Sequence, residues 1–440
     1  MAAGRLTVAI YAQLTPRLAG GIAEGVQQLV TQLSQLEGEE SYVLVTSPEG
    51  ADWLRPHLGV NQSLKVVAEH LSHTGPAWER QLAATIKRRA RPFLPAVERA
   101  WERIVLPIRA RLPGESGPPA SDGLIESLGA GVVHFPYQRF IRTELPSIFE
   151  PWDLQHRHLP EFFTLAERRA RDKLYTSACH QASSVIVASE WFRQDLMDQY
   201  AVPASKTLRV RRGPVVIAST LQTSELEITA IRQRCRIPGD FILYPAHLWP
   251  HKNHLRLLDA LALLRDSHDT RIQLVCTGGI REYVCEIQSR IAALRLQDQV
   301  TFAGYVSQTD LAVLYRLAKL LAFPSLFEGY GFPLVEAMAG GLPIACSNVG
   351  SMPEIVGSAA RLFDPLSAQS IADTILELWR NPSERERLAV NGRARSKLFD
   401  AGLAARTLRA LYRELAQRPL TDEDRHLLQQ GRAAATSRSS

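Results

Sequence analysis

The stretch Leu320–Gly357, which reads LLAFPSLFEGYGFPLVEAMAGGLPIACSNVGSMPEIVG, decides the fold of this chain. It opens with a short apolar run typical of a buried strand, continues through a loop with Gly329 and Gly331, and takes up a helical pattern at Pro333. Proline suits the first position of a helix, because its missing N–H would have no partner there. The stretch therefore predicts a strand, a glycine loop and a helix in direct succession, where a ligand can approach the backbone closely.

Two carboxylates, Glu328 and Glu336, bracket this turn eight residues apart. A carboxylate only accepts hydrogen bonds, and a vicinal diol such as that of a ribose offers two donors. We expect Glu336 to bind a ribose and Glu328 to lie where a sugar ring is held. The free N–H groups at the helix start, for example on Phe332 and Leu334, are expected to bind an anion together with the helix dipole. A capping pair with a solvated carboxylate is the alternative.

Short apolar runs alternate with helical patterns along the whole chain. Strands are predicted at Leu6–Ala12, Tyr42–Thr46, Leu64–Ala68, Val132–Phe135, Val185–Ser189 and Leu208–Val210, and again at Phe241–Ala246, Ile272–Thr277, Val300–Phe302, Leu320–Phe323 and Ile344–Ser347. Helices are predicted at Ala23–Leu36, Glu161–Cys179, Glu190–Tyr200, Leu255–Leu264, Glu282–Leu294, Thr309–Leu317, Pro333–Ala339 and Ala368–Trp379. This alternation predicts two α/β halves with parallel sheets, and a ligand cleft between them at the carboxyl ends of the strands.

Composition excludes several classes of protein. The chain has 440 residues, of which 45% are hydrophobic and 22% charged, so it can bury large cores and is not disordered as a whole. The net charge is 51 − 45 = +6, too small to indicate nucleic-acid binding. The five cysteines are dispersed, without a C-x-x-C pair or zinc-ligand spacing, which is typical of a reducing compartment. Because no run of 18 apolar residues occurs, we expect a cytoplasmic chain.

Two segments stand apart from this pattern. Residues 76–113 hold nine Arg and Lys residues against three Glu, together with aromatic side chains, within an insert of about residues 76–123. Such a stretch can lie on the anionic inner face of a membrane as a peripheral contact, and a solvated pair of helices is the alternative. The polar tail, residues 432–440, is expected to be disordered.

The stretch quoted first resembles the E-x7-E signature of the retaining glycosyltransferases of family four, also known as glycosyl transferases group 1. The following GSMPEIVG and RLFDP are similar to two further elements of that family, and the resemblance covers nearly the whole chain apart from the basic insert and the tail. It implies an α/β chain of GT-B fold, with two Rossmann-like domains facing a central cleft. Residues 1–215 would form the acceptor domain and 216–400 the nucleotide-sugar domain, with a helical region at 401–431 packing back on the first domain.

Further motifs place the donor in the second domain by resemblance. FILYPAHLWPHKNH, from residue 241, resembles the strand and loop that carry an Arg/Lys pair around the donor diphosphate. Lys252 matches the lysine, and His247 stands at the arginine position, which weakens the clamp or makes it depend on pH if His247 must be protonated. Gly278 would pass close to the nucleotide, and Val306 is a candidate for reading the base.

In the first domain, Gly20 and Gly21 match the glycine loop that lies opposite the donor phosphates. SIFEPWDLQHRHLPEFF, from residue 147, resembles a sugar-pocket element whose first histidine is replaced here by Trp152. Tryptophan cannot accept or release a proton, so Asp153, His156 or His158 would have to supply any side-chain chemistry. In some relatives the residues at Ser189 and Glu190 face the cleft.

The resemblance implies transfer of a hexosyl group from a nucleoside diphosphate sugar to a carbohydrate or lipid-linked acceptor, with retention, in bacterial polysaccharide or glycolipid assembly. Lys252, Glu328 and Asp153 are the expected catalytic residues, and the WPHKNH loop favours a mannosyl group. No D-x-D motif occurs at a strand end, so we expect no metal and no cofactor besides the donor itself.

Three alternatives remain. A non-catalytic protein that binds nucleotide sugars or carbohydrates would explain the departures at His247 and Trp152. An epimerase or phosphorylase could share the two-domain architecture. A DNA-modifying transferase is suggested by the basic insert, but no DNA-reading motif supports a nucleic-acid partner.

Overall fold

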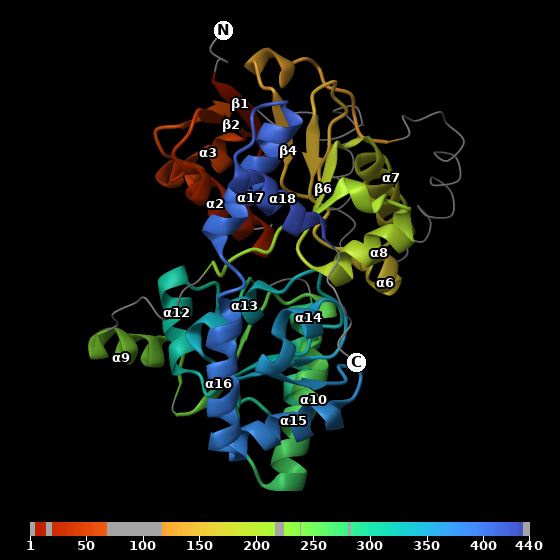
Figure 1. Cartoon of the computed structure of the whole chain (residues 1–440). Helices are drawn as coiled ribbons and strands as arrows, with labels where there is room; N and C mark the ends of the chain where they lie inside the picture. The colour runs from red at the N-terminus through yellow and green to blue at the C-terminus, as the bar shows by residue number, and fades with distance from the viewer. Residues whose placement is uncertain are drawn as a thin grey trace.

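The computed structural model describes residues 5–14, 20–67, 117–215, 224–237, 239–279 and 283–433. These residues form two lobes, one above the other, each built on a parallel sheet (Figure 1). The basic segment 76–113 and residues 434–440 lie outside the described residues. Arg432, predicted as the first residue of the tail, is the last residue of a helix.

The N-terminal sheet has seven parallel strands in the order β3-β2-β1-β4-β5-β6-β7. The inner strand β1 has the sequence LTVAIY and is almost entirely buried, as expected of a parallel strand covered on both faces. The bounds are β1 Leu6–Tyr11, β2 Glu40–Thr46, β3 Gln62–Val66, β4 Val132–Phe135, β5 Ser147–Phe149, β6 Ser184–Val187 and β7 Thr207–Arg209. The sequence did not predict β5, because three residues are too few to show a period.

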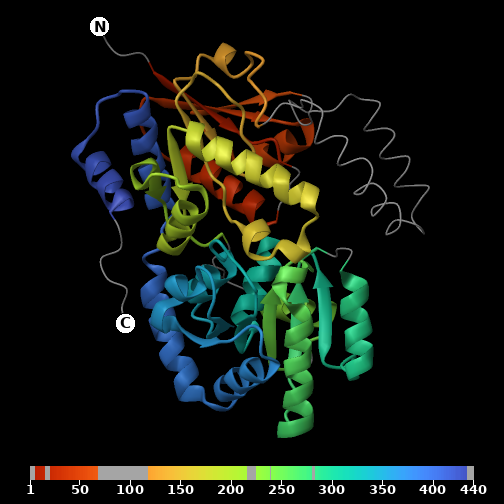
Figure 2. The same ribbon diagram turned by 90° about the vertical axis from the view of Figure 1, so that its right-hand side faces the viewer.

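The helices of this lobe are α2 Gly21–Ser34, α3 Pro48–Leu54, α6 Gln155–His158, α7 Leu165–Gln181 and α8 Glu190–Tyr200. Figure 2 shows α7 as the long helix lying across the face of the upper lobe. It begins four residues after the predicted start at Glu161. Thr164 and Glu167 form a capping box that fixes the start, since the Thr164 hydroxyl accepts from the Glu167 amide and the Glu167 carboxylate accepts from the Thr164 amide.

The C-terminal sheet has six parallel strands in the order β10-β9-β8-β11-β12-β13. Its strands are β8 Phe241–Pro245, β9 Gln273–Thr277, β10 Val300–Gly304, β11 Leu320–Phe323, β12 Ile344–Ser347 and β13 Ala360–Phe363. The helices are α9 Glu225–Arg234, α10 His254–His268, α11 Val284–Leu294, α12 Gln308–Leu317, α13 Phe332–Gly340, α14 Met352–Val356, α15 Ala368–Arg380 and α16 Pro382–Ser396. The sequence missed β13, an edge strand that is half exposed and carries Arg361 in place of a continuous apolar run.

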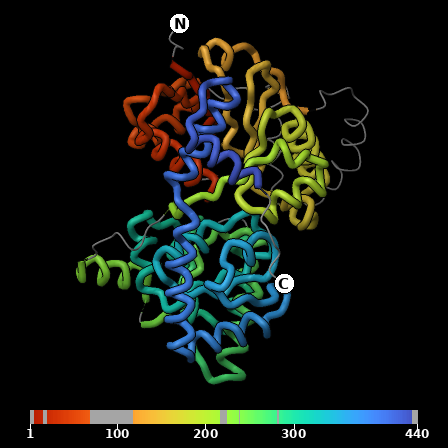
Figure 3. Tube along the Cα trace, viewed as in Figure 1, coloured from red at the N-terminus to blue at the C-terminus, as the bar shows by residue number. Residues whose placement is uncertain are grey.

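The chain returns to the N-terminal lobe after α16. Two final helices, α17 Ala401–Leu415 and α18 Asp422–Arg432, belong to the core of the N-terminal sheet, and α17 packs against α2. Figure 3 follows the blue trace from α16 upward into this position. The chain passes between the lobes near Gly213 and again near Ala401. These two crossings lie side by side: a β-carbon placed on Gly213 would lie 2.6 Å from the Ala401 nitrogen.

In both sheets the strand order reverses beside the first strand, at β1/β4 and at β8/β11. Loops at the carboxyl ends of such neighbouring strands diverge and leave a crevice. The two reversal points face one another across the junction of the lobes, so the loops after these four strands are brought together.

A buried polar network joins the segment around Arg212, where the chain leaves the N-terminal lobe, to the core of that lobe. Arg212 forms an ion pair with Glu150, which also accepts a hydrogen bond from His134 Nε2 at 2.8 Å. The Tyr412 hydroxyl of α17 donates to His134 Nδ1 at 2.7 Å, and the Tyr330 hydroxyl of the other lobe donates to the Arg212 carbonyl. Burial alone would raise the pKa of Glu150, but Arg212 and His134 together hold it below its ordinary value.

Arg212→Met should destabilise the protein by about 3–5 kcal/mol at pH 7, because it leaves the Glu150 charge buried without its partner. The lowered pKa of Glu150 means that the pair stabilises the fold above the ordinary carboxyl pKa and that this stabilisation is lost as the pH falls. The deficit should therefore shrink toward acid pH. Urea unfolding midpoints at pH 7 and pH 4 measure it.

The double variant Arg212→Met/Glu150→Gln is the matched control and should recover much of the lost stability. Equal midpoints for Arg212→Met and wild type at pH 7 would mean that the pair does not hold the crossing in place.

Candidate active site

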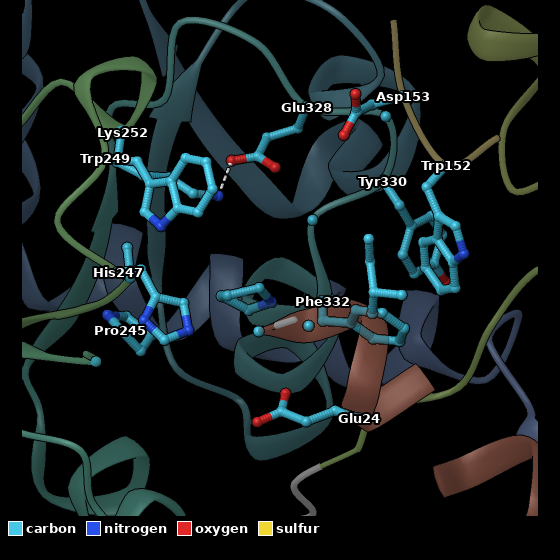
Figure 4. Close-up of a pocket in the computed structure, with 18 of the residues that line it drawn as sticks. Glu24, Trp152, Asp153, Pro245, His247, Trp249, Lys252, Glu328, Tyr330 and Phe332 are labelled. Atoms are coloured by element: carbon cyan, nitrogen blue, oxygen red, sulfur yellow. Dashed lines mark hydrogen bonds and ion pairs between the residues drawn. The ribbon is translucent and has the colours of Figure 1, made fainter. Parts of the chain in front are cut away.

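A cavity of about 290 Å³ lies between the lobes, at the carboxyl ends of both sheets. Figure 4 shows its wall, with Lys252 and Glu328 joined on one side and Glu24 near the opposite end. The N-terminal lobe contributes Gly20, Gly21, Ile22, Glu24, Gln138, Trp152, Asp153, Gln155 and Arg171. The C-terminal lobe contributes Pro245, Ala246, His247, Trp249, His251, Lys252, Thr277, Gly278, Tyr305, Val306, Leu311, Glu328, Gly329, Tyr330, Gly331, Phe332, Pro333 and Glu336.

Most of the residues proposed for the site from the sequence meet in this cavity, but Leu334 does not. Leu334 is fully buried in the core of the C-terminal lobe. Its amide, expected to be free at the helix start, donates to the Gly331 carbonyl at 3.0 Å. That expectation was wrong, because the chain tightens before α13 and uses this amide to close the turn.

Lys252 and Glu328 form an ion pair in the cavity wall, with 2.5 Å between Nζ and Oε1. Lys252 is the last residue of a short turn, Pro250–Lys252. The next residue, Asn253, is buried, and its side-chain amide donates to the carbonyls of Pro324 and Pro365, which fixes the turn. A lysine held in this way is a fixed cation next to the glycine loop, and its charge is balanced by Glu328.

His247 is held in one tautomer. Its Nδ1 accepts the Gly279 amide at 2.8 Å, so this nitrogen carries no proton and the ring presents Nε2 as an N–H donor. The Nε2 edge faces the other lobe, since a β-carbon on Gly20 would lie 3.0 Å from it. In this geometry His247 supplies one neutral hydrogen-bond donor, where the family's arginine would supply a charge.

Gly329 and Trp152 are in close contact across the junction of the lobes. A β-carbon on Gly329 would lie 2.0 Å from the Trp152 carbonyl oxygen, so only glycine fits. Trp152 itself has a left-handed backbone with φ of 66°, and its indole donates to the Pro136 carbonyl at 2.8 Å. Its ring packs on Phe332. At the position where the family has a histidine, the chain therefore has a packing residue.

Of the three neighbours considered for proton chemistry, only Asp153 lines the cavity. His156 bonds to Asp172 and Tyr200, and burial lowers its pKa to about 4. His158 bonds to Asp195 and stacks on the ring of Phe327. The hypothesis that either histidine serves the cavity was wrong, because both are committed to structural contacts.

Burial raises the pKa of Asp153, and the positive charge of Arg171 opposes part of this shift. Its carboxylate accepts from the Gln155 amide at 3.2 Å. Asp153 is thus fixed on the N-terminal side of the cavity.

Ser189 and Glu190 do not line the cavity, but they join the lobes. The Ser189 hydroxyl lies 3.4 Å from the Gly329 carbonyl as a donor. The carboxylate of Glu354, in the GSMPEIVG element, accepts the amides of Glu190 and Trp191 at 2.9 and 2.7 Å. A C-terminal residue therefore caps the N-terminal helix α8, and the junction is closed by hydrogen bonds from both sides.

Glu336 lies in the first turns of α13 and is almost fully buried at the cavity wall. The Tyr315 hydroxyl of α12 donates to its Oε2 at 2.7 Å and fixes the carboxylate. Burial raises the pKa of Tyr315 well above its ordinary range, and the charges of Glu336 and Glu24 add to this effect.

The sequence reasoning missed Glu24 and Arg171, among other lining residues. Glu24 lies four residues after Gly20 in the first turn of α2, and the turn of the helix carries it toward the cavity. That spacing was a usable signal. Arg171 stands in a run of charged residues on α7, where nothing in the sequence distinguishes it from its neighbours.

Among the described residues, no group of three His, Cys, Asp or Glu side chains could hold a metal ion. Within the same residues, no helix is both long enough and apolar enough to cross a membrane.

Glu24→Gln should stabilise the protein at pH 8 and change little at pH 4. Burial raises the pKa of Glu24 from 4.5 to about 7, so between these two pH values the folded state keeps a proton that the unfolded chain has released. The free energy of unfolding therefore falls as the pH rises through this range, by on the order of 2 kcal/mol. Thermal unfolding midpoints measured against pH follow the effect.

Glu39→Gln, at an exposed position, is the control and should give a difference from wild type that does not change with pH. The same flat profile for Glu24→Gln would mean that this carboxyl titrates normally.

Comparisons with known proteins agree on the class. Residues 228–395 match the family described as Glycosyl transferases group 1. The O-antigen chain mannosyltransferase B of Escherichia coli is 28% identical over 242 residues, which are 54% of this chain and 63% of that protein. The mannosylfructose-phosphate synthase of Agrobacterium fabrum is 28% identical over 69% of this chain and 68% of its own length. The chain thus spans less than two thirds of the first of these relatives.

Solved structures share the whole architecture. HepE of Anabaena, in complex with UDP and glucose, has a TM-score of 0.64 at 19% identity, covering 92% of this chain and 99% of its own. Sucrose-phosphate synthase of Thermosynechococcus elongatus has a TM-score of 0.66 at 20% identity, covering 93% and 99%. The predicted GT-B fold is confirmed by these likenesses and by the two parallel sheets. The C-terminal lobe therefore resembles the glycosyl transferases of group 1, and the whole chain shares the GT-B fold.

Proposed function

We propose that this protein transfers a hexosyl group from a nucleoside diphosphate sugar to an acceptor hydroxyl, with retention at the anomeric carbon. One observation carries the proposal: a single cavity between the lobes gathers Lys252, the Nε2–H of His247, the start of α13 and the carboxylate of Glu336. A fixed cation, a neutral donor and a helix N-terminus together suit a diphosphate. A buried carboxylate next to them suits a ribose diol.

In the proposed reaction, the bond between the anomeric carbon and the diphosphate oxygen breaks, and its electron pair goes to that oxygen. Lys252 shares its charge between Glu328 and the departing diphosphate, and His247 donates a hydrogen bond to it. The acceptor oxygen bonds to the anomeric carbon on the same face, and its proton passes to the leaving phosphate. Trp152 is compatible with this route, because no side-chain base is needed at its position.

The relatives named as mannosyltransferases or as a mannosylfructose-phosphate synthase support a mannosyl group as the one transferred. Their names also support a role in assembling a polysaccharide or a related glycoside. The closed junction, with Gly329 against Trp152 and Glu354 on α8, would exclude water from the donor during transfer.

The first test is to incubate the full chain with a panel of UDP-, GDP- and ADP-sugars, with and without EDTA, and to measure release of free nucleotide. Slow release from one donor, unaffected by EDTA, is expected. Tight binding of one donor without release, even in the presence of carbohydrate acceptors, would favour a non-catalytic binding protein. Release that EDTA abolishes would contradict the expected independence from metal.

With the donor in hand, Glu336→Ala should raise the donor KM and lower kcat/KM by roughly 10²-fold, because a charged hydrogen-bonding partner is lost. Tyr315→Phe is the matched control. It removes only the hydroxyl that orients Glu336 and should have a smaller effect. Near-normal kinetics for Glu336→Ala would remove this residue from the donor site.

We also propose that residues 76–113, which lie outside the described residues, contact an anionic membrane surface from the cytoplasmic side. The excess of nine basic over three acidic residues supports this. Deleting the segment should reduce sedimentation with anionic liposomes and leave nucleotide release intact. Unchanged sedimentation would favour the solvated helix pair.

A further inference from the structure

Arg171 is a cation in the cavity that the proposed donor chemistry does not use. It lies on α7, in the N-terminal lobe, and lines the same side of the cavity as Asp153 and Gln155. Its guanidinium stacks on the ring of Phe163, with 4.7 Å from Cζ to the ring centroid. A guanidinium stacked on an aromatic face keeps the N–H groups at its edge available for two parallel hydrogen bonds.

The acidic residues of α7 that could neutralise Arg171 are bound elsewhere. Glu167 lies four residues earlier, the ideal spacing for an ion pair, but its carboxylate accepts from the Thr164 amide and hydroxyl at 2.8 and 2.9 Å. Asp172 pairs with Arg157 at 2.7 Å and with His156 at 3.1 Å. Among the described residues, the stacking on Phe163 is the direct contact of Arg171, and neither a hydrogen bond nor an ion pair is formed.

Asp153 is the remaining acidic neighbour. The positive charge of Arg171 acts to lower the pKa of Asp153, but burial raises this pKa by more. No ion pair joins the two side chains. A half-buried guanidinium with five donors and no acceptor is costly to leave unpaired. The Arg171 guanidinium is therefore placed to bind an anionic group of a ligand.

Arg171 comes from the lobe opposite to the groups proposed to bind the donor diphosphate. Lys252, His247 and the start of α13 all come from the C-terminal lobe, whereas Arg171 comes from the opposite lobe. In Figure 4, Asp153 and His247 lie on opposite sides of Glu328. Besides Asp153, Arg171 acts on His251, whose pKa is lowered well below its ordinary value first by burial and then by neighbouring positive charges.

We infer that Arg171 binds an oxyanion of the acceptor, a phosphoryl or carboxylate group, and thereby orients the acceptor hydroxyl toward the donor. The inference rests on the proposed glycosyl transfer and names the chemical class of its second substrate. It also gives a reason for the PEFF segment at residues 160–163, because Phe163 is the platform that presents the guanidinium edge to the cavity.

Binding of inorganic phosphate to the full chain provides the first test, with the donor site filled by a saturating nucleoside diphosphate. The wild type should show a saturable further rise in Tm as phosphate is added. Arg171→Gln should weaken this response by at least about 10-fold. Arg169→Gln is the matched control, because Arg169 is exposed on the same helix, and it should respond like the wild type.

The second test compares acceptors in the transfer reaction: a neutral hexose, the same hexose as its 6-phosphate, a hexuronic acid, and a prenyl diphosphate-linked sugar. The wild type should prefer an anionic acceptor, and Arg171→Gln should lower its kcat/KM for that acceptor by roughly 10²-fold by raising the acceptor KM. The donor KM should change far less than the acceptor KM. The preferred acceptor tells a free phosphate or carboxylate from a lipid-linked diphosphate.

Arg171→Lys keeps the charge but loses the paired donors, and should fall between wild type and Arg171→Gln. Equal phosphate binding by wild type and Arg171→Gln, or a shift in donor KM alone, would overturn the inference and leave the transferase proposal standing. Absence of nucleotide binding and release with every donor would instead overturn the proposed function itself.

Discussion

The contact between Gly329 and the Trp152 carbonyl is the constraint on which the rest of the site depends. It joins the loops after β11 and β5 with no room for a β-carbon, so the two backbones approach closely at the carboxyl ends of the sheets. Two charged groups of the cavity flank this contact: Glu328 immediately precedes Gly329, and Asp153 immediately follows Trp152. The hydrogen bonds of Ser189 and Glu354 across the same junction then hold the contact in register.

The resulting cavity has an electrostatic division between its two lobes. On the C-terminal side, the one lysine is balanced by Glu328, and His247 is neutral because the Gly279 amide occupies its Nδ1. On the N-terminal side, Arg171 has no counter-ion at bonding distance among the described residues. A donor therefore meets directed hydrogen bonds and a paired lysine, whereas an anionic acceptor would supply Arg171 with the counter-ion that no described residue places at bonding distance.

Much of the fold and of the candidate site could be predicted from the sequence, because the strongest sequence signals are local. The Leu320–Gly357 stretch carries its strand, loop and helix within one continuous pattern, and nearly all residues chosen from such patterns line the cavity. The failures concern hydrogen bonds and ion pairs that the residue pattern does not specify. The Leu334 amide is used inside its own turn, His156 and His158 are bound by α7 and α8, and the isolation of Arg171 follows from bonds made by Glu167 and Asp172 to other partners. Of these, the Thr164–Glu167 capping box alone has a sequence motif.

The return of α17 and α18 to the first lobe restricts how the lobes can move. They are connected covalently at two places, near Gly213 and near Ala401, and these lie against one another. Two adjacent connections act as a hinge. Rotation of the lobes about the line through both connections requires little change in the chain, whereas sliding of one lobe over the other would stretch it. Two adjacent connections thus favour a hinge-like opening of the cavity over sliding of one lobe across the other.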